Sequence, residues 1–349
     1  MKILIVNNMA PFLWGGAEEL AVHLEKNLII AGHDAEILRI PFQWEPANVI
    51  PSQMLMVRAF ELWNVDHVIA LKFPAYLIRH PNKTLWLLHQ YRQAYDLFDV
   101  GQSNISADAT GDELRTIIHN ADNEAFSETR CIFTNSDVTR QRLLKYNGFD
   151  AEVLLPPLND PELFNGGTPQ GYVFAGGRVN GMKRQHLLVE AMVQTAPHVR
   201  LVVAGPPETP DDTLRLQRLV EQHGLQDRVK LDIRFLTRVE LARYVNEANA
   251  CAYLPFDEDS LGYVAMEAAT ARKPIISSSD SGGVLGLVRH METGLVADPN
   301  PESLAIALNQ ACRDSDSVKA MGHAAYNLWN DMEILWPATI ERLLAACRS

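Results

Sequence analysis

Short apolar runs rich in valine, isoleucine and leucine alternate with longer segments of helical periodicity along most of the chain. Continuous apolar runs are typical of strands buried on both faces, and their alternation with helices indicates parallel, doubly wound α/β sheets. In the first half the pattern predicts strands near residues 2–7, 35–40, 67–71, 85–89, 131–134 and 152–155. In the second half it predicts strands near residues 172–175, 200–204, 229–233, 250–254 and 274–277.

A segment rich in proline and glycine separates the two sets of predicted strands. It reads Leu-Pro-Pro-Leu-Asn-Asp-Pro over 155–161 and Asn-Gly-Gly over 165–167, which suits an interdomain hinge near 156–170. The tail, about 324–346, has helical periodicity, and Pro337 within it predicts a kink or break. We therefore expect two doubly wound domains with a ligand cleft between them, because ligands bind such sheets outside the carboxyl ends of the strands.

Composition and charge narrow the class of protein. A chain of 349 residues with 47% hydrophobic and 21% charged residues is long enough for two globular domains and is not disordered or fibrous. Its net charge of −12 argues against a nucleic-acid partner and against broad contact with anionic lipid. No signal-peptide pattern follows Met1 and no apolar stretch approaches the length of a membrane span, so a cytoplasmic protein is expected.

The cysteines give no sign of a disulfide framework or a zinc site. They lie far apart in the sequence and form no Cys-x-x-Cys pair. The four positions are Cys131, Cys251, Cys312 and Cys347.

Two glycine-rich loops follow predicted strands. Gly15 and Gly16 open a helix, whose first amides favour an anion, although a simple tight turn explains them equally well. The loop over residues 176–183 carries Arg178 and Lys183, two cations that can clamp a diphosphate. The alternative for this second loop is a pair of solvated basic side chains.

An acidic loop over residues 257–260 runs into a helix expected to start near residue 261 or 262. The first-turn amides of that helix can receive phosphate. Asp259 and Glu267 are eight residues apart, and steps of ~100° place them about 80° apart around the helix, on one side. Carboxylates accept paired hydrogen bonds from vicinal sugar hydroxyls. Complementing the helix dipole would explain Asp259 but not the deeper Glu267.

Two further candidates have weaker patterns. The sequence Ser-Asp-Ser-Gly-Gly-Val over residues 279–284 follows a predicted strand and is a candidate anion contact, with a simple turn as the alternative. His89 lies at the carboxyl end of a first-half strand, where it would face the expected cleft, although an isolated histidine is more often structural.

Taken in order, these motifs resemble glycosyltransferase family 4, the retaining sugar transferases of GT-B fold. The resemblance implies a Rossmann-like acceptor-side domain over 1–165, a nucleotide-sugar-binding domain over 166–325, and a C-terminal helical segment over 326–349 that returns to the first domain. It covers nearly the whole chain, through residues 2–6, 15–18, 135–136, 142–143, 177–178, 183, 203–205, 262–268, 281–283 and 293–296.

The resemblance implies roles residue by residue. Arg178 and Lys183 match the family's diphosphate-binding pair, and Glu267 matches the acid that usually holds the nucleotide ribose. Asp259 takes the place of the acid that usually holds donor-sugar hydroxyls, and His89 resembles the first-domain histidine that contacts the donor sugar. These five are the catalytic candidates. The donor site would be completed by Gly15, Gly16, Ser260, Leu261, Gly262 and Tyr263.

The implied reaction moves a sugar from a nucleotide-diphosphate sugar to an acceptor hydroxyl with retained configuration, in the synthesis of polysaccharide, lipopolysaccharide or another glycoconjugate. The family generally needs no metal or other cofactor. The acceptor would be a carbohydrate or a lipid-linked molecule, and any membrane contact would be peripheral and made through the acceptor. The nucleotide base, the sugar, the acceptor, the linkage and the oligomeric state stay open.

Two departures from the family pattern leave alternatives. The first acid is Asp259 rather than glutamate, with Glu258 beside it, and Gly286 stands where an acid is common. Both lie near the expected donor site, so they bear on donor choice and on activity. A sugar-nucleotide 2-epimerase of the same fold, or an inactive nucleotide-sugar-binding partner protein, are the competing interpretations.

Overall fold

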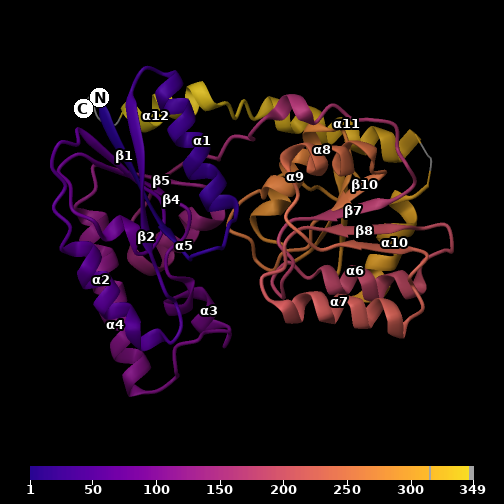
Figure 1. Ribbon diagram of the computed structural model, residues 1–349, viewed down its shortest axis with the longest axis horizontal. Helices are drawn as coiled ribbons and strands as arrows, with labels where there is room; N and C mark the ends of the chain where they lie inside the picture. The colour runs from indigo at the N-terminus through magenta and orange to yellow at the C-terminus, as the bar shows by residue number, and fades with distance from the viewer. Residues whose placement is uncertain (314–315, 346–349) are drawn as a thin grey trace. The chain divides into compact units, whose positions relative to one another are not determined.

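The computed structural model describes residues 1–313 and 316–345, and the chain divides into two compact units (Figure 1). Unit 1 comprises Met1–Pro157 and the segment from Leu335 onward, and unit 2 comprises Leu158–Ile334. The first division falls within the predicted hinge at 156–170, earlier than the expected boundary at 165. The second falls within the predicted tail segment 326–349. Cys347 and the last four positions of that tail lie outside the described residues.

Unit 1 is a parallel α/β sheet in the order β2-β1-β3-β4-β5-β6. Its strands are β1 (Lys2–Met9), β2 (Asp34–Pro41), β3 (His67–Ala70), β4 (Lys83–Leu87), β5 (Cys131–Thr134) and β6 (Glu152–Val153). Its helices are α1 (Gly16–Ile30), α2 (Ile50–Arg58), α3 (Asp96–Asp99), α4 (Ala109–Ser127), α5 (Asp137–Asn147) and α12 (Trp336–Ala345).

Alternating side chains of the unit 1 strands bury themselves in two separate clusters. Leu85 and Leu87 of β4 join the cluster formed with α2, α4 and α5, whereas Trp86 joins the cluster formed with α1 and α12. Both faces are therefore covered, which explains why these strands read as continuous apolar runs. Strand β4 ends at Leu87, earlier than predicted, so His89 lies in the loop that follows it.

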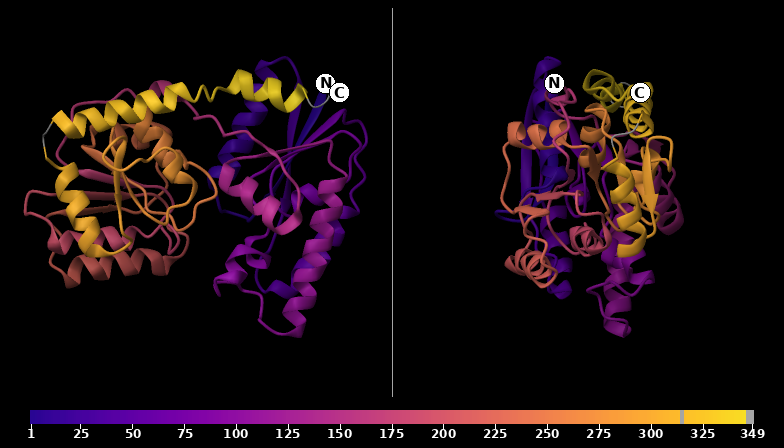
Figure 2. Two further views of the ribbon diagram at one scale, coloured as in Figure 1. Left: turned by 180° about the vertical axis from the view of Figure 1, so that it is seen from behind. Right: turned by 90° about the vertical axis from the view of Figure 1, so that its right-hand side faces the viewer.

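The C-terminal helix α12 packs on unit 1, as the sequence predicted (Figure 2). Ile340 and Leu343 are buried in one cluster with Leu24 of α1, and Arg342 donates to the carbonyl oxygen of Val153 at 3.0 Å. The predicted kink at Pro337 is wrong in position. Helix α11 (Asp316–Asp331) ends before residue 332 and α12 starts at Trp336, so Pro337 occupies the first turn, where its missing N–H breaks no helical hydrogen bond.

Unit 2 is a second parallel sheet in the order β12-β11-β10-β7-β8-β9. Its strands are β7 (Val173–Gly176), β8 (Leu201–Ala204), β9 (Val229–Asp232), β10 (Ala250–Ala252), β11 (Ile275–Ser278) and β12 (Gly294–Ala297). Its helices are α6 (Gln185–Ala191), α7 (Pro210–Gln222), α8 (Arg238–Glu247), α9 (Tyr263–Thr270), α10 (Pro301–Ala311) and α11. The sequence prediction missed β12, a run of only four residues that begins with glycine.

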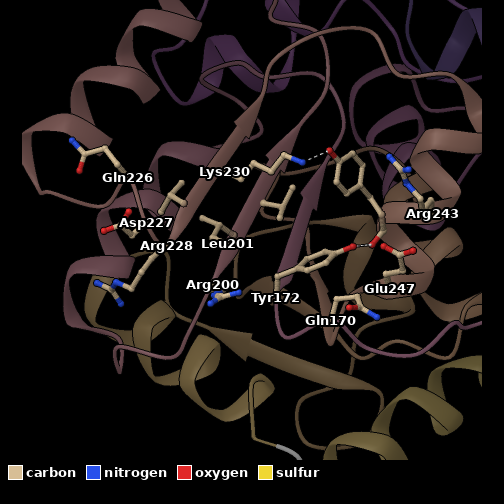
Figure 3. A pocket seen from close by; sticks show the side chains of 13 residues that line it. Gln170, Tyr172, Arg200, Leu201, Gln226, Asp227, Arg228, Lys230, Arg243 and Glu247 are labelled. Carbon is tan, nitrogen blue, oxygen red and sulfur yellow. Dashed lines mark hydrogen bonds between the residues drawn. The ribbon is translucent and has the colours of Figure 1, made fainter.

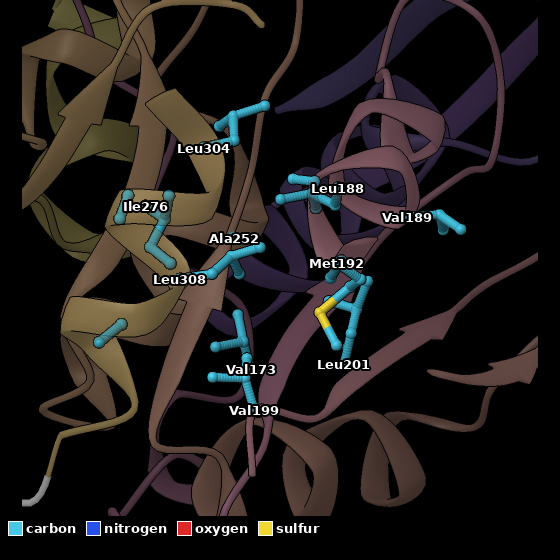
Figure 4. Packing of buried hydrophobic residues seen from close by; sticks show 14 of the residues in the cluster. Val173, Leu188, Val189, Met192, Val199, Leu201, Ala252, Ile276, Leu304 and Leu308 are labelled. Atoms are coloured by element: carbon cyan, nitrogen blue, oxygen red, sulfur yellow. The ribbon is translucent and has the colours of Figure 1, made fainter. Parts of the chain in front are cut away.

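The core of unit 2 lies between its sheet and helices α6, α7 and α10 (Figure 4). Val173 and Leu201 from the strands meet Leu188 of α6 and Leu304 of α10 there. Helices α8 and α9 cover the other face (Figure 1). Helix α11 packs against α9, and its Val318 and Met321 join the cluster formed with α6, α7 and α10. The two doubly wound sheets predicted from the sequence are confirmed, and every paired strand that the structure describes runs parallel. The loops that follow the strands therefore gather at one edge of each sheet.

A buried carboxyl group in α4 gives unit 1 a specific pH sensitivity. Asp122 is fully buried and accepts a hydrogen bond from the hydroxyl of Tyr95 at 2.7 Å. Within the described residues, its second oxygen, Oδ1, has no hydrogen-bond partner. Burial raises the pKa of Asp122 from its ordinary 3.8 to about 7, because a charged carboxylate loses its hydration there.

We expect Asp122→Asn to stabilise the protein at pH 8 relative to wild type, and much less at pH 5. In the unfolded chain Asp122 ionises near pH 4, whereas in the folded protein it stays protonated up to about pH 7. Its contribution to the free energy of unfolding is therefore lost as the pH rises toward the folded-state pKa. Thermal unfolding at both pH values tests this. Asp112→Asn, on an exposed position of the same helix, is the control. An equal change in Tm at both pH values would contradict the assignment.

Candidate functional site

The predicted second-half site residues gather at the carboxyl edge of the unit 2 sheet, in helix α9 and in the loops after β7, β10 and β11. The loop after β7 touches the loop after β8 through the backbone. A Cβ on Gly205 would lie 2.0 Å from the carbonyl oxygen of Gly177, so this contact requires glycine. The backbone N–H of Val179 also donates to Pro206 at 2.9 Å. The loop that carries Arg178 is therefore fixed against its neighbour.

Arg178 and Lys183 occupy this loop with different surroundings. The guanidinium of Arg178 lies 3.9 Å from the carboxylate of Glu208 and stays partly exposed. The ammonium of Lys183 donates to the hydroxyl of Tyr253 at 2.8 Å and forms an ion pair with Glu258. Tyr253 in turn donates to Glu258 at 2.9 Å. An internal carboxylate therefore lies at one of the two predicted phosphate-binding cations.

A third cation, Arg184, joins three loops and was missed in the sequence. Its guanidinium donates to the carbonyl oxygens of Leu254 and Pro255, to the hydroxyl of Ser278 and to both carboxylate oxygens of Asp280, at 2.7 to 2.9 Å. These hydrogen bonds hold the pKa of Asp280 below its ordinary value. The only sequence signal was a further basic residue directly after Lys183, and that pattern alone did not separate a structural role from a binding one.

The acidic loop lies against the loop after β11. The N–H of Asp257 donates to the carbonyl oxygen of Asp280 at 2.8 Å, and Gly283 donates to Glu258 at 2.8 Å. A Cβ on Gly282 would lie 2.6 Å from the backbone nitrogen of Glu258. The side chain of Ser281 is fully buried, and its hydroxyl accepts from the N–H of Ser278 at 3.2 Å, so it serves this turn internally.

Asp259 and Glu267 do not share a side of one helix, so that prediction is wrong. Helix α9 begins at Tyr263, which leaves Asp259 and residues 260–262 in the preceding loop. Gly262 has φ +77° and ψ +129°, outside the helical region, so helical spacing cannot be counted across it. A Cβ there would lie 2.4 Å from the ring of Tyr253. Gly286 is the other position at which this sequence departs from the family pattern. It faces Leu261, whose Cδ2 would lie 3.1 Å from an added Cβ.

Glu267 lies inside α9 and is almost completely buried. Its carboxylate pairs with Arg238, the first residue of α8, which the sequence analysis also missed. Thr237 caps that helix and accepts from the N–H of Glu240, so the start of α8 is well defined. The guanidinium of Arg238 also donates to the carbonyl oxygen of Asn159 at 2.7 Å.

The first-half candidates belong to unit 1 and lie at the carboxyl edge of its sheet. Gly15 caps α1 in an extended conformation and Gly16 is its first residue. The Nδ1 atom of His89 is 2.8 Å from the carbonyl oxygen of Gln90. Burial, followed by the nearby positive charge of Lys72, lowers the pKa of His89 to about 4. His89 is therefore neutral near pH 7, and donation from Nδ1 leaves Nε2 as a hydrogen-bond acceptor.

Within the parts of the chain that the structure describes, no group of three or more His, Cys, Asp or Glu side chains is arranged to hold a metal ion. The same parts contain no helix with the length and apolar character needed to cross a bilayer.

A separate pocket of about 420 Å³ lies beside α8 at the amino ends of β7, β8 and β9, away from the predicted site residues (Figure 3). Its lining includes Tyr172, Arg200, Lys230 and Arg243.

Comparison with known proteins gives a family match over the second half of the chain. Residues 164–328 match the family described as glycosyl transferases group 1. The chain is 28% identical over 218 residues to a D-inositol 3-phosphate glycosyltransferase of Jonesia denitrificans, an alignment that covers 57% of this chain. The chain spans about half the length of this curated relative, 51%.

Two solved structures share the fold over essentially their whole length. Sucrose-phosphate synthase from Thermosynechococcus elongatus has a TM-score of 0.77 at 19% identity, covering 99% of this chain and 98% of that one. Anabaena Alr3699/HepE, solved in complex with UDP and glucose, has a TM-score of 0.73 at 17% identity, covering 100% and 99%. The chain thus has the predicted GT-B fold, and its residues 164–328 match the glycosyl transferases group 1 family.

Proposed function

We propose that this protein is a glycosyltransferase that moves a sugar from a nucleotide-diphosphate sugar to an acceptor hydroxyl. The observation that carries the proposal is the gathering of Arg178, Lys183, Glu267 and the start of α9 at one edge of the unit 2 sheet, within the segment that matches glycosyl transferases group 1. The crystal structure of Alr3699/HepE, a protein of the same fold, in complex with UDP and glucose supports a donor of this chemical class.

In the proposed site, cationic side chains lie where negative charge develops on the leaving group. As the bond between the anomeric carbon and the diphosphate oxygen breaks, Arg178, Lys183 and the N–H groups at the start of α9 stabilise the departing diphosphate. Glu267 accepts hydrogen bonds from the ribose hydroxyls, and Asp259 is the candidate partner of the donor-sugar hydroxyls. Because these protein groups supply the stabilisation, the proposal needs no metal ion or other cofactor.

The acceptor hydroxyl forms the new bond to the anomeric carbon on the face that the diphosphate leaves, and its proton passes to the leaving phosphate. Configuration is then retained without a covalent bond to the enzyme. Two residues of unit 1 are further candidates in this proposal: the neutral His89 for the donor sugar, and Gly16 for the donor phosphates and the acceptor. The biological role in this proposal is the assembly of a polysaccharide or other glycoconjugate in the cytoplasm, on a carbohydrate or lipid-linked acceptor.

A panel of UDP, GDP, ADP, TDP and CDP, with EDTA and with Mg²⁺, tests the donor site. We expect one nucleotide to raise the Tm by mass action without a metal ion.

Arg178→Ala and Lys183→Ala should each lower turnover with the matching sugar nucleotide by about 10²–10³-fold, because each removes a charge that stabilises the leaving group. Arg289→Ala, at an exposed arginine paired with Glu292, is the control. Near-normal turnover in both site variants would refute the diphosphate assignment.

Glu258→Gln tests whether the internal carboxylate competes with the donor for Lys183. Removing its charge should tighten binding of the cognate nucleoside diphosphate by about two- to fivefold, the equivalent of about 0.5–1 kcal/mol for a partly exposed ion pair. Isothermal titration calorimetry measures this, with Glu292→Gln as the exposed control. Weaker binding of the nucleotide in Glu258→Gln would show instead that Glu258 supports the phosphate site.

A further inference from the structure

Arg238 connects the buried acid of α9 to the segment where unit 2 begins. One nitrogen of its guanidinium, Nη1, pairs with the carboxylate of Glu267, and the other, Nη2, donates to the carbonyl oxygen of Asn159 at 2.7 Å. Its Nε atom lies 3.7 Å from the carboxylate of Asp160. A single side chain therefore fixes a predicted ligand-binding carboxylate and residues 159–160 relative to each other.

Because Glu267 is buried, its contact with Arg238 determines the environment of its carboxylate. The side chain of Glu267 is only 2% exposed, so its charge depends on a partner inside the protein. The guanidinium is planar, and its position is restricted further because it lies 4.8 Å from the centre of the buried Phe164 ring. A planar donor fixed at several points determines the direction in which the carboxylate points, whereas a lysine would supply charge without that geometry.

A second residue of α8 holds the same segment without touching Glu267. The Asn246 side chain donates to the carbonyl oxygen of Leu163 at 2.8 Å and accepts from the N–H of Gly166 at 3.1 Å. The attachment of residues 159–166 to α8 is therefore shared between Arg238 and Asn246. This gives an internal comparison, because a loss at Asn246 loosens the segment but leaves the ion pair of Glu267 in place.

We propose that Arg238 is a positioning residue for donor recognition: it orients the Glu267 carboxylate toward the hydroxyls of the nucleotide ribose without contacting the ligand itself. The inference rests on the proposed function and adds to it a residue outside the predicted motifs. It explains how a carboxylate buried this deeply keeps both its charge and its direction. It also assigns the start of α8 to the donor site, although α8 follows a different strand from α9.

The test compares binding of the cognate nucleoside diphosphate, chosen from the panel above, by calorimetry in wild type and five variants: Arg238→Met, Arg238→Lys, Glu267→Gln, Arg238→Met combined with Glu267→Gln, and Asn246→Ala. Arg238→Met should weaken binding about tenfold. Arg238→Lys should recover part of that loss because it keeps the charge. Asn246→Ala should stay within about twofold of wild type.

The double variant supplies a readout that a purely structural role would not move. If Arg238 acts through Glu267, then Arg238→Met should cause little further loss of affinity when Glu267→Gln is already present. In turnover, Arg238→Met should raise the donor KM and leave the acceptor KM unchanged. Should Arg238→Met fail to fold, Arg238→Lys compared in the wild-type and Glu267→Gln backgrounds gives the same coupling.

The outcomes separate the two proposals. Wild-type affinity in Arg238→Met, an equal loss in Asn246→Ala, or losses that simply add in the double variant would each overturn the positioning role while leaving the donor site intact. Failure of the wild-type protein to bind any nucleoside diphosphate would instead overturn the proposed function and this inference with it.

Discussion

The Arg184 guanidinium is the contact on which the candidate site of unit 2 depends. It donates to two carbonyl oxygens in the loop after β10, to Ser278 at the end of β11 and to Asp280 in the loop after β11. Because Arg184 directly follows Lys183, the same contact fixes where the predicted phosphate-binding loop lies. Parallel strands bring their following loops to one edge, and backbone hydrogen bonds join neighbouring loops there. Arg184 adds side-chain hydrogen bonds that connect its own loop to both of the others.

The predicted ligand-binding charges are already paired within the protein. Lys183 pairs with Glu258, and Glu267 pairs with Arg238. These two pairs have different consequences. The Lys183 pair is partly exposed and places an anion where the proposed function puts a phosphate, so in that proposal the donor competes with Glu258. The Glu267 pair is buried, so each of its two charges is stabilised mainly by the other. The pair also fixes the direction of the Glu267 carboxylate. In the proposed function, the Lys183 contact breaks when the donor binds, and the Glu267 contact stays in place.

Burial and charge pairing have different effects on the pKa values of three groups in this protein. In unit 1, burial raises the pKa of Asp122 and lowers the pKa of His89, so both are held toward their neutral forms. In unit 2, the Arg184 side chain lowers the pKa of Asp280 and keeps that group charged. In the proposed function, the neutral imidazole of His89 is matched to sugar hydroxyl groups, and the charged side chains of unit 2 are matched to a diphosphate.

The sequence by itself determined the two sheets, nearly all of their strands and the glycine loops, because continuous apolar runs and tight turns are set by residues close together along the chain. It also placed Arg178, Lys183 and Glu267 near one sheet edge, since a strand and its following loop are neighbours in sequence. Only the tertiary structure decided that Arg184 bonds to Asp280, that Arg238 pairs with Glu267, and that Asp259 precedes the helix. Those pairs join residues 96 and 29 positions apart, and no local pattern specifies which distant loops will meet when the sheet forms.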